Sequence, residues 1–511
     1  MDMNQSSSHN QALHRRGFLG QIGAGLGGIA LTSLLSRERI LSQTTNARLP
    51  QFAPKAKRVI QLFMNGGASQ CDLFDYKPTL EKLNGKPFDP GEGVHVEASV
   101  SEIGNLMKSP FTWAQYGQSG RWVSSAIPNL AKHVDDMAFL MAMTSPSNVH
   151  GPAAYLQTSG FAVPGFPCMG AWISYALGSL NENVPSFVGL PDGKGFPYNG
   201  RSTFTHGFLP ANHQGFIVRT GQKEPATHLT PPASAKFVTT KSRREGLDLL
   251  NDLNRHHANE RVADDRLQAR IKSYELAARL QLSAPGLIEI DQESQDTREL
   301  YGIDRQPTAD FGRRCLMARR MIERGVRFVQ VWSGHGGGSQ NWDNHGDIPS
   351  ELPYIANQMD QPAAALLQDL KMRGLLDDTL LIWTTEFGRM PFTQGATKGR
   401  DHNGGTFASW FAGAGIKPGI TYGESDAWSW KATTNATSRH DFHATILHLL
   451  GMDHEDLTVY HNGIERRLTD VHGHVIEGIL AQLLKNYIIY GSKNGWTING
   501  KPTSISVFLL C

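Results

Sequence analysis

Cysteine is scarce in this sequence, and its few residues are far apart. There are four cysteines in 511 residues and no Cys-x-x-Cys pair, which excludes a zinc ribbon and a thioredoxin motif. Excess charge is also lacking, because 49 Lys and Arg are balanced by 47 Asp and Glu. The resulting net charge of +2 provides no strong field for nucleic acid or an anionic membrane, so neither is expected as a partner. With 40% hydrophobic residues, the chain still has enough apolar material for a large buried core.

Histidine, in contrast, is abundant. The chain has 20 His, and many of them stand beside Asp in its second half. Imidazole and carboxylate together are suitable ligands for divalent metals. This pairing is the first indication of function, although a single His–Asp pair is more often a surface or capping pair than a ligand.

The N-terminus is similar to a twin-arginine export signal. Arg15 and Arg16 precede Phe18 and a weakly apolar run that ends near residue 35. We therefore expect residues 1–47 to be a signal and linker, the twin-arginine translocase to be a partner, and the protein to be periplasmic or extracellular. A run of about 19 residues is also just long enough to span a bilayer, but its six glycines make a poor spanning helix. Because no Ala-x-Ala cleavage site follows, retention of the segment as a membrane anchor stays open.

The pattern of apolar residues predicts an α/β fold. Strands are expected at 58–64, 327–332 and 379–384, and helices at 127–134, 243–282, 353–373 and 440–450. Strands that alternate with helices favour a mostly parallel central sheet with helices on both faces, which is a three-layer α/β/α sandwich. We assign residues 48–485 to this domain and residues 486–511 to a C-terminal tail.

Polar residues of the metal-binding type follow the ends of the three predicted strands. Asn65 follows the first strand, Asp343 and His345 follow the second, and Glu386 follows the third. In open α/β sheets, the edge at the carboxyl ends of the strands is where ligands bind. The sequence therefore predicts a site at this edge.

Longer stretches resemble the alkaline phosphatase and sulfatase superfamily, at residues 127–160, 359–388 and 441–451. In finer detail, residues 57–480 resemble the bacterial family catalogued as domain of unknown function 1501. The motifs that carry this second resemblance are Asn65–Asp72, Trp342–His345, Thr385–Arg389, Gly399–His402 and Arg467–His472. The resemblance implies an alkaline-phosphatase-like version of the predicted sandwich.

Two motifs depart from the superfamily pattern. A sulfatase has Cys or Ser in C/S-x-P-x-R, where that residue is oxidised to formylglycine, whereas this chain has Thr144 in the Cys place and Asn148 in the Arg place. The metal-binding Asp-His that follows the third strand in the superfamily is replaced here by Glu386-Phe387. The missing imidazole could come from His402. We therefore expect a sulfatase-like protein without the formylglycine motif.

The resemblance also implies one or two divalent metal sites. Their expected ligands are Asn65, Asp72, Asp343, His345, Glu386, Asp401 and His402. His440 is an undecided further ligand, since superfamily members bring a late ligand from this part of the chain. Mixed oxygen and nitrogen ligands suit Zn or Mn better than Ca, which prefers oxygen alone.

The residues themselves leave several candidates for the nucleophile and for the anion-binding groups. Ser69, Thr144 and His150 lie near the expected place, and a metal-activated water is an alternative. Ser69 can equally cap the start of a helix. Arg389 and Arg400 could clamp an oxyanion bidentately or pair with nearby carboxylates.

These observations favour an exported, metal-dependent hydrolase of phosphate or sulfate esters. The expected substrate is a small anionic ester or a sulfated or phosphorylated glycan. An alternative is a non-catalytic exported binding protein that keeps the fold but has lost the chemistry. In a third interpretation, the His and Asp residues are only structural polar networks in loops.

Overall fold

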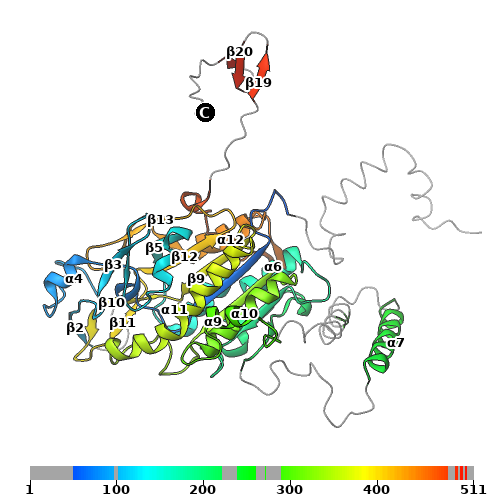
Figure 1. Ribbon diagram of the computed structural model, residues 1–511, viewed down its shortest axis with the longest axis horizontal. Helices are drawn as coiled ribbons and strands as arrows, with labels where there is room; N and C mark the ends of the chain where they lie inside the picture. The colour runs from blue at the N-terminus through cyan, green and yellow to red at the C-terminus, as the bar shows by residue number, and fades with distance from the viewer. Residues whose placement is uncertain are drawn as a thin grey trace, which may run out of the picture. The chain divides into compact units, whose positions relative to one another are not determined.

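The structure is a computed structural model that describes residues 50–96, 102–220, 239–259 and 289–481 (Figure 1). It also describes three single helical positions between 259 and 289, and strands β19 (Ile489–Ser492), β20 (Gly495–Ile498) and β21 (Lys501–Pro502). The predicted export signal and most of the second half of the helix expected at 243–282 lie outside these residues. Among the described residues, no helix is both long enough and apolar enough to cross a membrane.

A nine-stranded mixed sheet forms the centre of the domain. Its order is β13 (Ile420–Tyr422), β5 (Met137–Thr144), β12 (Phe407–Gly413), β9 (Thr379–Thr385), β1 (Arg58–Met64), β8 (Phe328–Ser333), β6 (Phe187–Leu190) and β7 (Phe216–Ile217), and β16 (Thr437–Ser438) also pairs with β5. Of these nine strands, only β12 is antiparallel to its neighbours. The carboxyl ends of the other eight therefore meet at one edge, where the amino end of β12 also lies.

Side chains of the central strand alternate between two apolar layers. Ile60 and Leu62 of β1 pack into one core with α10 (Ala309–Glu323) and α11 (Ile348–Met372). Val59 and Phe63 pack into the other core with α6 (Met169–Leu177) and α12 (Arg439–Leu449). This alternation is the period-two pattern of a strand buried on both faces. The arrangement confirms the predicted α/β fold with helices on both sides of a mostly parallel sheet.

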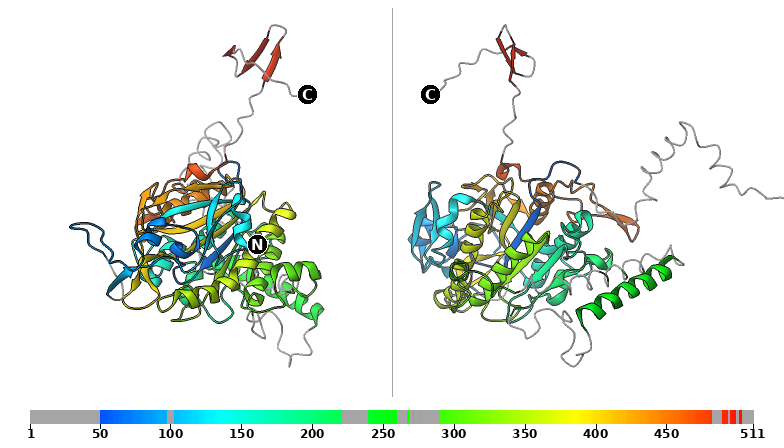
Figure 2. Two further views of the ribbon diagram at one scale, coloured as in Figure 1. Left: turned by 60° about the vertical axis from the view of Figure 1, so that its left-hand side comes forward. Right: turned by 45° about the vertical axis from the view of Figure 1, so that its right-hand side comes forward.

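The helices that cover the first face of the sheet are neighbours. Helices α10 and α11 lie side by side, and α9 (Gln295–Tyr301) contacts both of them (Figures 1 and 2). The remaining elements are α3 (Gln70–Leu73), α4 (Pro78–Leu83), β3 (Trp113–Tyr116), β4 (Arg121–Ser124), α5 (His150–Ser159), the 3-10 helices η2 (Gly200–Phe204), η3 (Ala211–His213) and η4 (Glu477–Ile479), α7 (Thr240–Asn259), β14 (Glu424–Ser425), β15 (Ala432–Thr434), β17 (Val459–His461) and β18 (Ile464–Arg466).

A small antiparallel sheet supports the loops at the ligand edge. It has the order β11 (Arg400–Asn403), β10 (Gly388–Gln394) and β2 (Ile103–Leu106). Strand β10 follows β9 almost directly, and β11 leads into the reversed strand β12. The sheet therefore holds the residues from 388 to 403 against the carboxyl ends of β1 and β8.

The predicted elements that fall within the described residues agree with the structure except in one helix. The three predicted strands correspond to β1, β8 and β9, and the helices at 353–373 and 440–450 correspond to α11 and α12. At 127–134, however, the α-helix prediction was wrong, because the chain forms the 3-10 helix η1 (Leu130–Asp136). Its apolar residues mimic helical periodicity over a segment of only two turns.

Candidate metal centre

Five segments bring polar side chains to the ligand edge of the sheet. Asn65 follows β1, His150 begins α5 after β5, and Glu386 follows β9. Asp343 lies in the loop after β8, and His402 lies on β11 ahead of the reversed strand β12. The sequence predicted three of these strand ends, and the structure adds the loop after β5 and the strand before β12.

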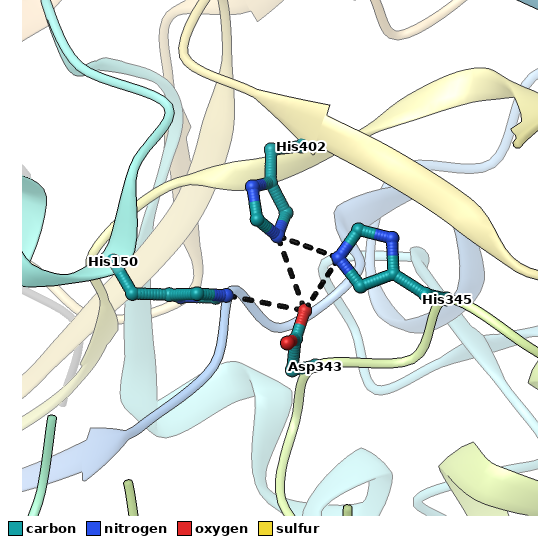
Figure 3. A group of neighbouring side chains, drawn as sticks. All are labelled: His150, Asp343, His345 and His402. Atoms are coloured by element: carbon teal, nitrogen blue, oxygen red, sulfur yellow. Dashed lines mark hydrogen bonds and ion pairs between the residues drawn. The ribbon is translucent and has the colours of Figure 1, made fainter. Parts of the chain in front are cut away.

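Four of the side chains at this edge converge on one point (Figure 3). The group consists of His150, Asp343, His345 and His402, and all four ligand atoms lie within 4.8 Å of one another. Asp343 Oδ1 lies 3.1 Å from His150 Nε2, 2.8 Å from His345 Nε2 and 3.1 Å from His402 Nε2. His345 Nε2 and His402 Nε2 are themselves 2.7 Å apart.

The other nitrogen of each imidazole faces an oxygen acceptor. His150 Nδ1 donates to Glu386 Oε1 at 2.8 Å, and His402 Nδ1 donates to the Asn148 carbonyl at 2.7 Å. His345 Nδ1 contacts the side-chain oxygen of Gln394. Because a neutral imidazole carries one N–H, a proton on Nδ1 leaves a lone pair on Nε2. Each ring that is neutral with its proton on Nδ1 therefore directs a lone pair at Asp343 Oδ1.

This convergence of electron pairs fits a bound cation. With the three rings neutral and their protons on Nδ1, lone pairs would meet the carboxylate oxygen and one another at 2.7–3.1 Å, and a cation bound between them would remove this repulsion. Ligating histidines characteristically donate their second N–H to a carboxylate or carbonyl, as these three do. One carboxylate with three imidazoles is also a common donor set for divalent metal ions. The residues present thus fit a metal ion.

Arg389 supplies a permanent positive charge beside this group. Its guanidinium is fully buried, and Nη2 donates to Asp343 Oδ1 at 2.7 Å. The guanidinium also donates to the carbonyl oxygens of Gly66, Gly67 and Arg400. Arg389 is therefore held by protein acceptors on several sides, in addition to its contact with Asp343.

The neighbouring charges shift the pKa values of the group. Burial raises the pKa of Asp343, but Arg389 and the three imidazoles outweigh it and hold that pKa well below its usual range. Burial lowers the pKa of His402 to about 4, helped by the charge of Arg389. Burial also acts to lower the pKa of His150, yet Asp343 and Glu386 leave it raised, because both carboxylates favour a positive charge on the ring. A metal ion at Nε2 would supply that positive charge in place of a second proton. Asp343 is thus ionised and His402 is neutral at pH 7.

Tyr198, which is held by Asn341, orients the group, and the sequence indicated neither residue. The ring of Tyr198 stacks on His150 with a centroid distance of 4.2 Å and an interplanar angle of 4°. Tyr198 Oη lies 3.4 Å from Asp343 Oδ2 and accepts a hydrogen bond from Asn341 Nδ2 at 3.1 Å. A lone Tyr in a loop has no motif that could have shown this role.

The turn after β1 closes tightly around the group. Gly66 N donates to Glu386 Oε1 at 2.8 Å, and a Cβ on Gly66 would lie 2.5 Å from Asp343 N. Gly66 also has a φ of 123°, which L side chains rarely adopt. The preceding residue, Asn65, is fully buried, and its side-chain oxygen and nitrogen have no hydrogen-bond partner among the residues that the structure describes. Such an unpaired buried amide is rare unless an ion, water or ligand satisfies it.

Some predicted site residues lie in a different buried cluster. Asp72 accepts hydrogen bonds from Arg400 Nε at 2.7 Å and Nη2 at 3.1 Å, and both side chains are fully buried. Ser69, a predicted nucleophile, donates to the Asp72 carboxylate at 2.5 Å. Neither Asp72 nor Arg400 reaches the four-residue group.

Other predicted residues contact the backbone. Asp401 accepts the N–H of His402 at 2.8 Å, and Thr144 Oγ1 donates to the Thr437 carbonyl at 3.4 Å. His440 Nε2 donates to the Gly160 carbonyl at 3.0 Å. His150, predicted as a catalytic residue, is instead one of the four convergent side chains. Glu386 contacts the group through His150, and Phe387 packs on the rings of His150 and His402.

Solved structures that are similar to this chain are distant. A sulfatase from Pseudoalteromonas sp. is 13% identical, with 83% of this chain and 71% of that chain covered and a TM-score of 0.34. The alkaline phosphatase from the Antarctic bacterium TAB5 is 13% identical, with 72% and 94% covered and a TM-score of 0.30. A phosphonate monoester hydrolase from Silicibacter pomeroyi is 12% identical, with 64% and 69% covered and a TM-score of 0.29. The fold assignment therefore rests on the sheet and layers described above.

No curated protein matches the sequence. A family model described as "Protein of unknown function (DUF1501)" matches residues 56–480, which is most of the chain and confirms the resemblance seen in the motifs. This chain belongs to the DUF1501 family.

Proposed function

We propose that this protein is an exported, metal-dependent hydrolase of phosphate or sulfate esters. The observation that carries the proposal is the convergence of three imidazole nitrogens and one carboxylate oxygen at the ligand edge of the sheet. With three nitrogen donors, the site suits Zn or Mn better than Ca. The choice of ester follows the motif resemblance to the alkaline phosphatase and sulfatase superfamily.

Each residue of the centre has a definite task in this proposal. His150, Asp343, His345 and His402 would hold the metal ion, and Glu386 fixes the ring of His150. A divalent ion held there supplies Lewis-acid stabilisation of the ester oxygens and lowers the pKa of a water molecule. Asn65, whose buried amide lacks a partner in the described chain, would bind the ion or a substrate oxygen.

The attacking group in this proposal is water rather than a side chain. Ser69 Oγ donates to Asp72, and Thr144 Oγ1 donates to a carbonyl, so neither hydroxyl is directed at the metal group. Arg389 and Arg400 are likewise held by protein acceptors. Neutralisation of the ester oxyanion therefore falls mainly to the metal ion.

Activity on an aryl phosphate and an aryl sulfate tests the proposal. In the Zn- or Mn-loaded protein, His345→Ala should lower kcat/KM by about a hundredfold or more, the scale expected when transition-state charge stabilisation is lost. His474→Ala is the matched control, because the His474 side chain is 94% exposed and lies outside the group. Ser69→Ala and Thr144→Ala should retain activity. Loss of activity in either hydroxyl variant, with its fold intact, would contradict the water mechanism.

Export requires a separate test. We expect replacement of Arg15 and Arg16 with Lys to trap the protein in the cytoplasm, because the paired arginines are the recognised feature of the signal. Cell fractionation of the double variant measures this. Unchanged export would end the twin-arginine assignment without affecting the proposed chemistry.

A non-catalytic binding protein remains the second candidate. Phe387 stands where the superfamily has a ligand His, and it packs against His150 and His402 with centroid distances of 4.9 and 4.6 Å. Both hydroxyl candidates are also engaged by the protein. If the metal-loaded wild type hydrolyses neither ester but binds a sulfated or phosphorylated glycan, this second candidate replaces the first.

A further inference from the structure

The loop between β6 and η2 runs directly past the metal centre. Its Tyr198 stacks on His150, and Asn199 Nδ2 donates to the carbonyl of Gly151 at 2.8 Å. The carbonyl of Phe196 accepts the N–H of Gly336 at 2.7 Å, which ties the loop to the segment that leads to Asp343. Phe196 is two residues from Tyr198, so its Cα lies at most about 7 Å from that of Tyr198.

Two arginines flank the ring of Phe196. The guanidinium carbon of Arg201 lies 5.0 Å from the ring centroid, and that of Arg219 lies 5.2 Å from it. Neither arginine forms an ion pair or a hydrogen bond with any part of the chain that the structure describes. Lys194 of the same loop donates at 2.6 Å only to the neutral oxygens of Gln340 and Tyr354.

The surroundings of Phe196 provide no free carboxylate for these two arginines among the described residues. The only carboxylate of the loop, Asp192, is already paired with the buried Arg314 at 3.1 Å. The two guanidinium groups on Phe196 are at most about 10 Å apart and repel each other. Contact with an aromatic face is a weak attraction at an exposed site and leaves the charge in place. In addition, Arg219 Nε is buried without a partner among the described residues.

We propose that Arg201 and Arg219 form a subsite for a second anionic group of the substrate. Guanidinium groups bind sulfate and phosphate through two parallel N–H donors, and both arginines have donors free for this. The two arginines, from η2 and from the segment after β7, flank Phe196 of the loop that contacts His150, so one molecule could reach the subsite and the metal centre together. The preferred substrate class is therefore an ester that carries a second sulfate or phosphate. This inference rests on the proposed function.

The experiment compares a monosulfated disaccharide with its disulfated counterpart. We expect Arg201→Gln combined with Arg219→Gln to raise KM for the disulfated sugar by about 10- to 100-fold, which corresponds to losing a charge-assisted hydrogen bond. The KM for the monosulfated sugar and both kcat values should change less than about twofold, because the metal centre is intact. Lys82→Gln combined with Lys86→Gln is the matched control, since it removes two exposed positive charges elsewhere.

Direct binding of both sugars to the metal-loaded protein separates the two proposals. If the wild type hydrolyses neither sugar but binds the disulfated one more tightly, and this preference is lost in the double arginine variant, the hydrolase proposal fails and the subsite stands. If the wild type shows no preference for the disulfated sugar, or if the double variant keeps it, the subsite is overturned. If the lysine control lost the preference for the disulfated sugar to the same extent, the preference would come from general electrostatic attraction, and the subsite would also be overturned.

Discussion

Asp343 and Asp72 are two carboxylates near the same edge of the sheet. They differ in how many hydrogen-bond donors the surrounding side chains direct at each of them. Asp72 receives two N–H groups from Arg400 and one O–H from Ser69, so the protein itself neutralises it. Asp343 receives one N–H group from Arg389 but also faces the Nε2 atoms of three imidazoles, each of which has an oxygen acceptor at Nδ1 on the opposite side of the ring. The comparison teaches that the acceptors held by the neighbouring groups, rather than the residue type, separate the candidate metal ligand Asp343 from the ion-paired Asp72.

The histidines show the same contrast. His440 and His443 use Nε2 to donate to the carbonyls of Gly160 and Gln157, both at 3.0 Å. Their Nε2 atoms therefore carry protons and cannot bind a metal without breaking these bonds. In His150 and His402 the proton lies on Nδ1 instead. Substitutions at the ion-paired Asp72 and around the candidate ligand His150 should therefore have different effects on stability and on metal binding.

The largest effect is expected for Asp72→Ala. The substitution leaves the fully buried guanidinium of Arg400 without its counter-charge, and breaking such a pair costs about 3–5 kcal/mol of unfolding free energy. Urea unfolding measures this loss, and elemental analysis of the folded fraction should find unchanged metal. Asp304→Ala is the control, because its pair with Arg298 is exposed to solvent and should contribute far less to the unfolding free energy. Loss of metal on Asp72→Ala would show that the two carboxylates are not distinct in function.

A smaller effect is expected for Glu386→Gln. The charge that orients His150 through Nδ1 is removed while the shape is kept, and such outer partners typically contribute about 10- to 100-fold to metal affinity. Competition with a metal indicator measures the change. Glu455→Gln, at a 64% exposed side chain, should leave the affinity unchanged. An unchanged affinity in Glu386→Gln would mean that His150 needs no oriented tautomer.

The smallest effect is expected at Tyr198. Tyr198→Leu removes the ring stacked on His150, and an aromatic pair contributes about 0.5–1.5 kcal/mol, so metal affinity should fall by about two- to tenfold. Tyr198→Phe keeps the ring and loses only a long 3.4 Å contact with Asp343, so its affinity should stay close to that of the wild type. The same indicator titration distinguishes them. Equal affinities in the Leu and Phe variants would show that stacking does not position His150.

Much of the fold and the location of the site could be predicted from local patterns. The apolar runs at β1, β8 and β9 are bounded by turn residues, and their ends share one edge in any parallel sheet. Strand β5, with the sequence MAFLMAMT, was not predicted, because an apolar run without β-branched residues in its interior also suits a buried helix. The reversed direction of β12, which brings His402 to the ligand edge, depends on tertiary pairing.

The pairing of individual side chains could not be predicted. Asp72 and Arg400 are 328 positions apart, and nothing in either motif indicates that they neutralise each other. His150 stood in a segment where a nucleophile was expected, and only the structure places its ring in one group with Asp343, His345 and His402. Residue types indicated metal chemistry, whereas the assignment of ligands required the hydrogen-bond partners.

Metal content is the most direct measurement of the central claim. Protein purified without chelator should contain about one Zn or Mn ion per chain, and its removal by a chelator should lower the melting temperature, because an ion that binds only the folded state stabilises it. Re-addition of the same ion should restore the melting temperature. Protein that contains no metal and melts at the same temperature with and without chelator would show that His150, Asp343, His345 and His402 form only a polar network.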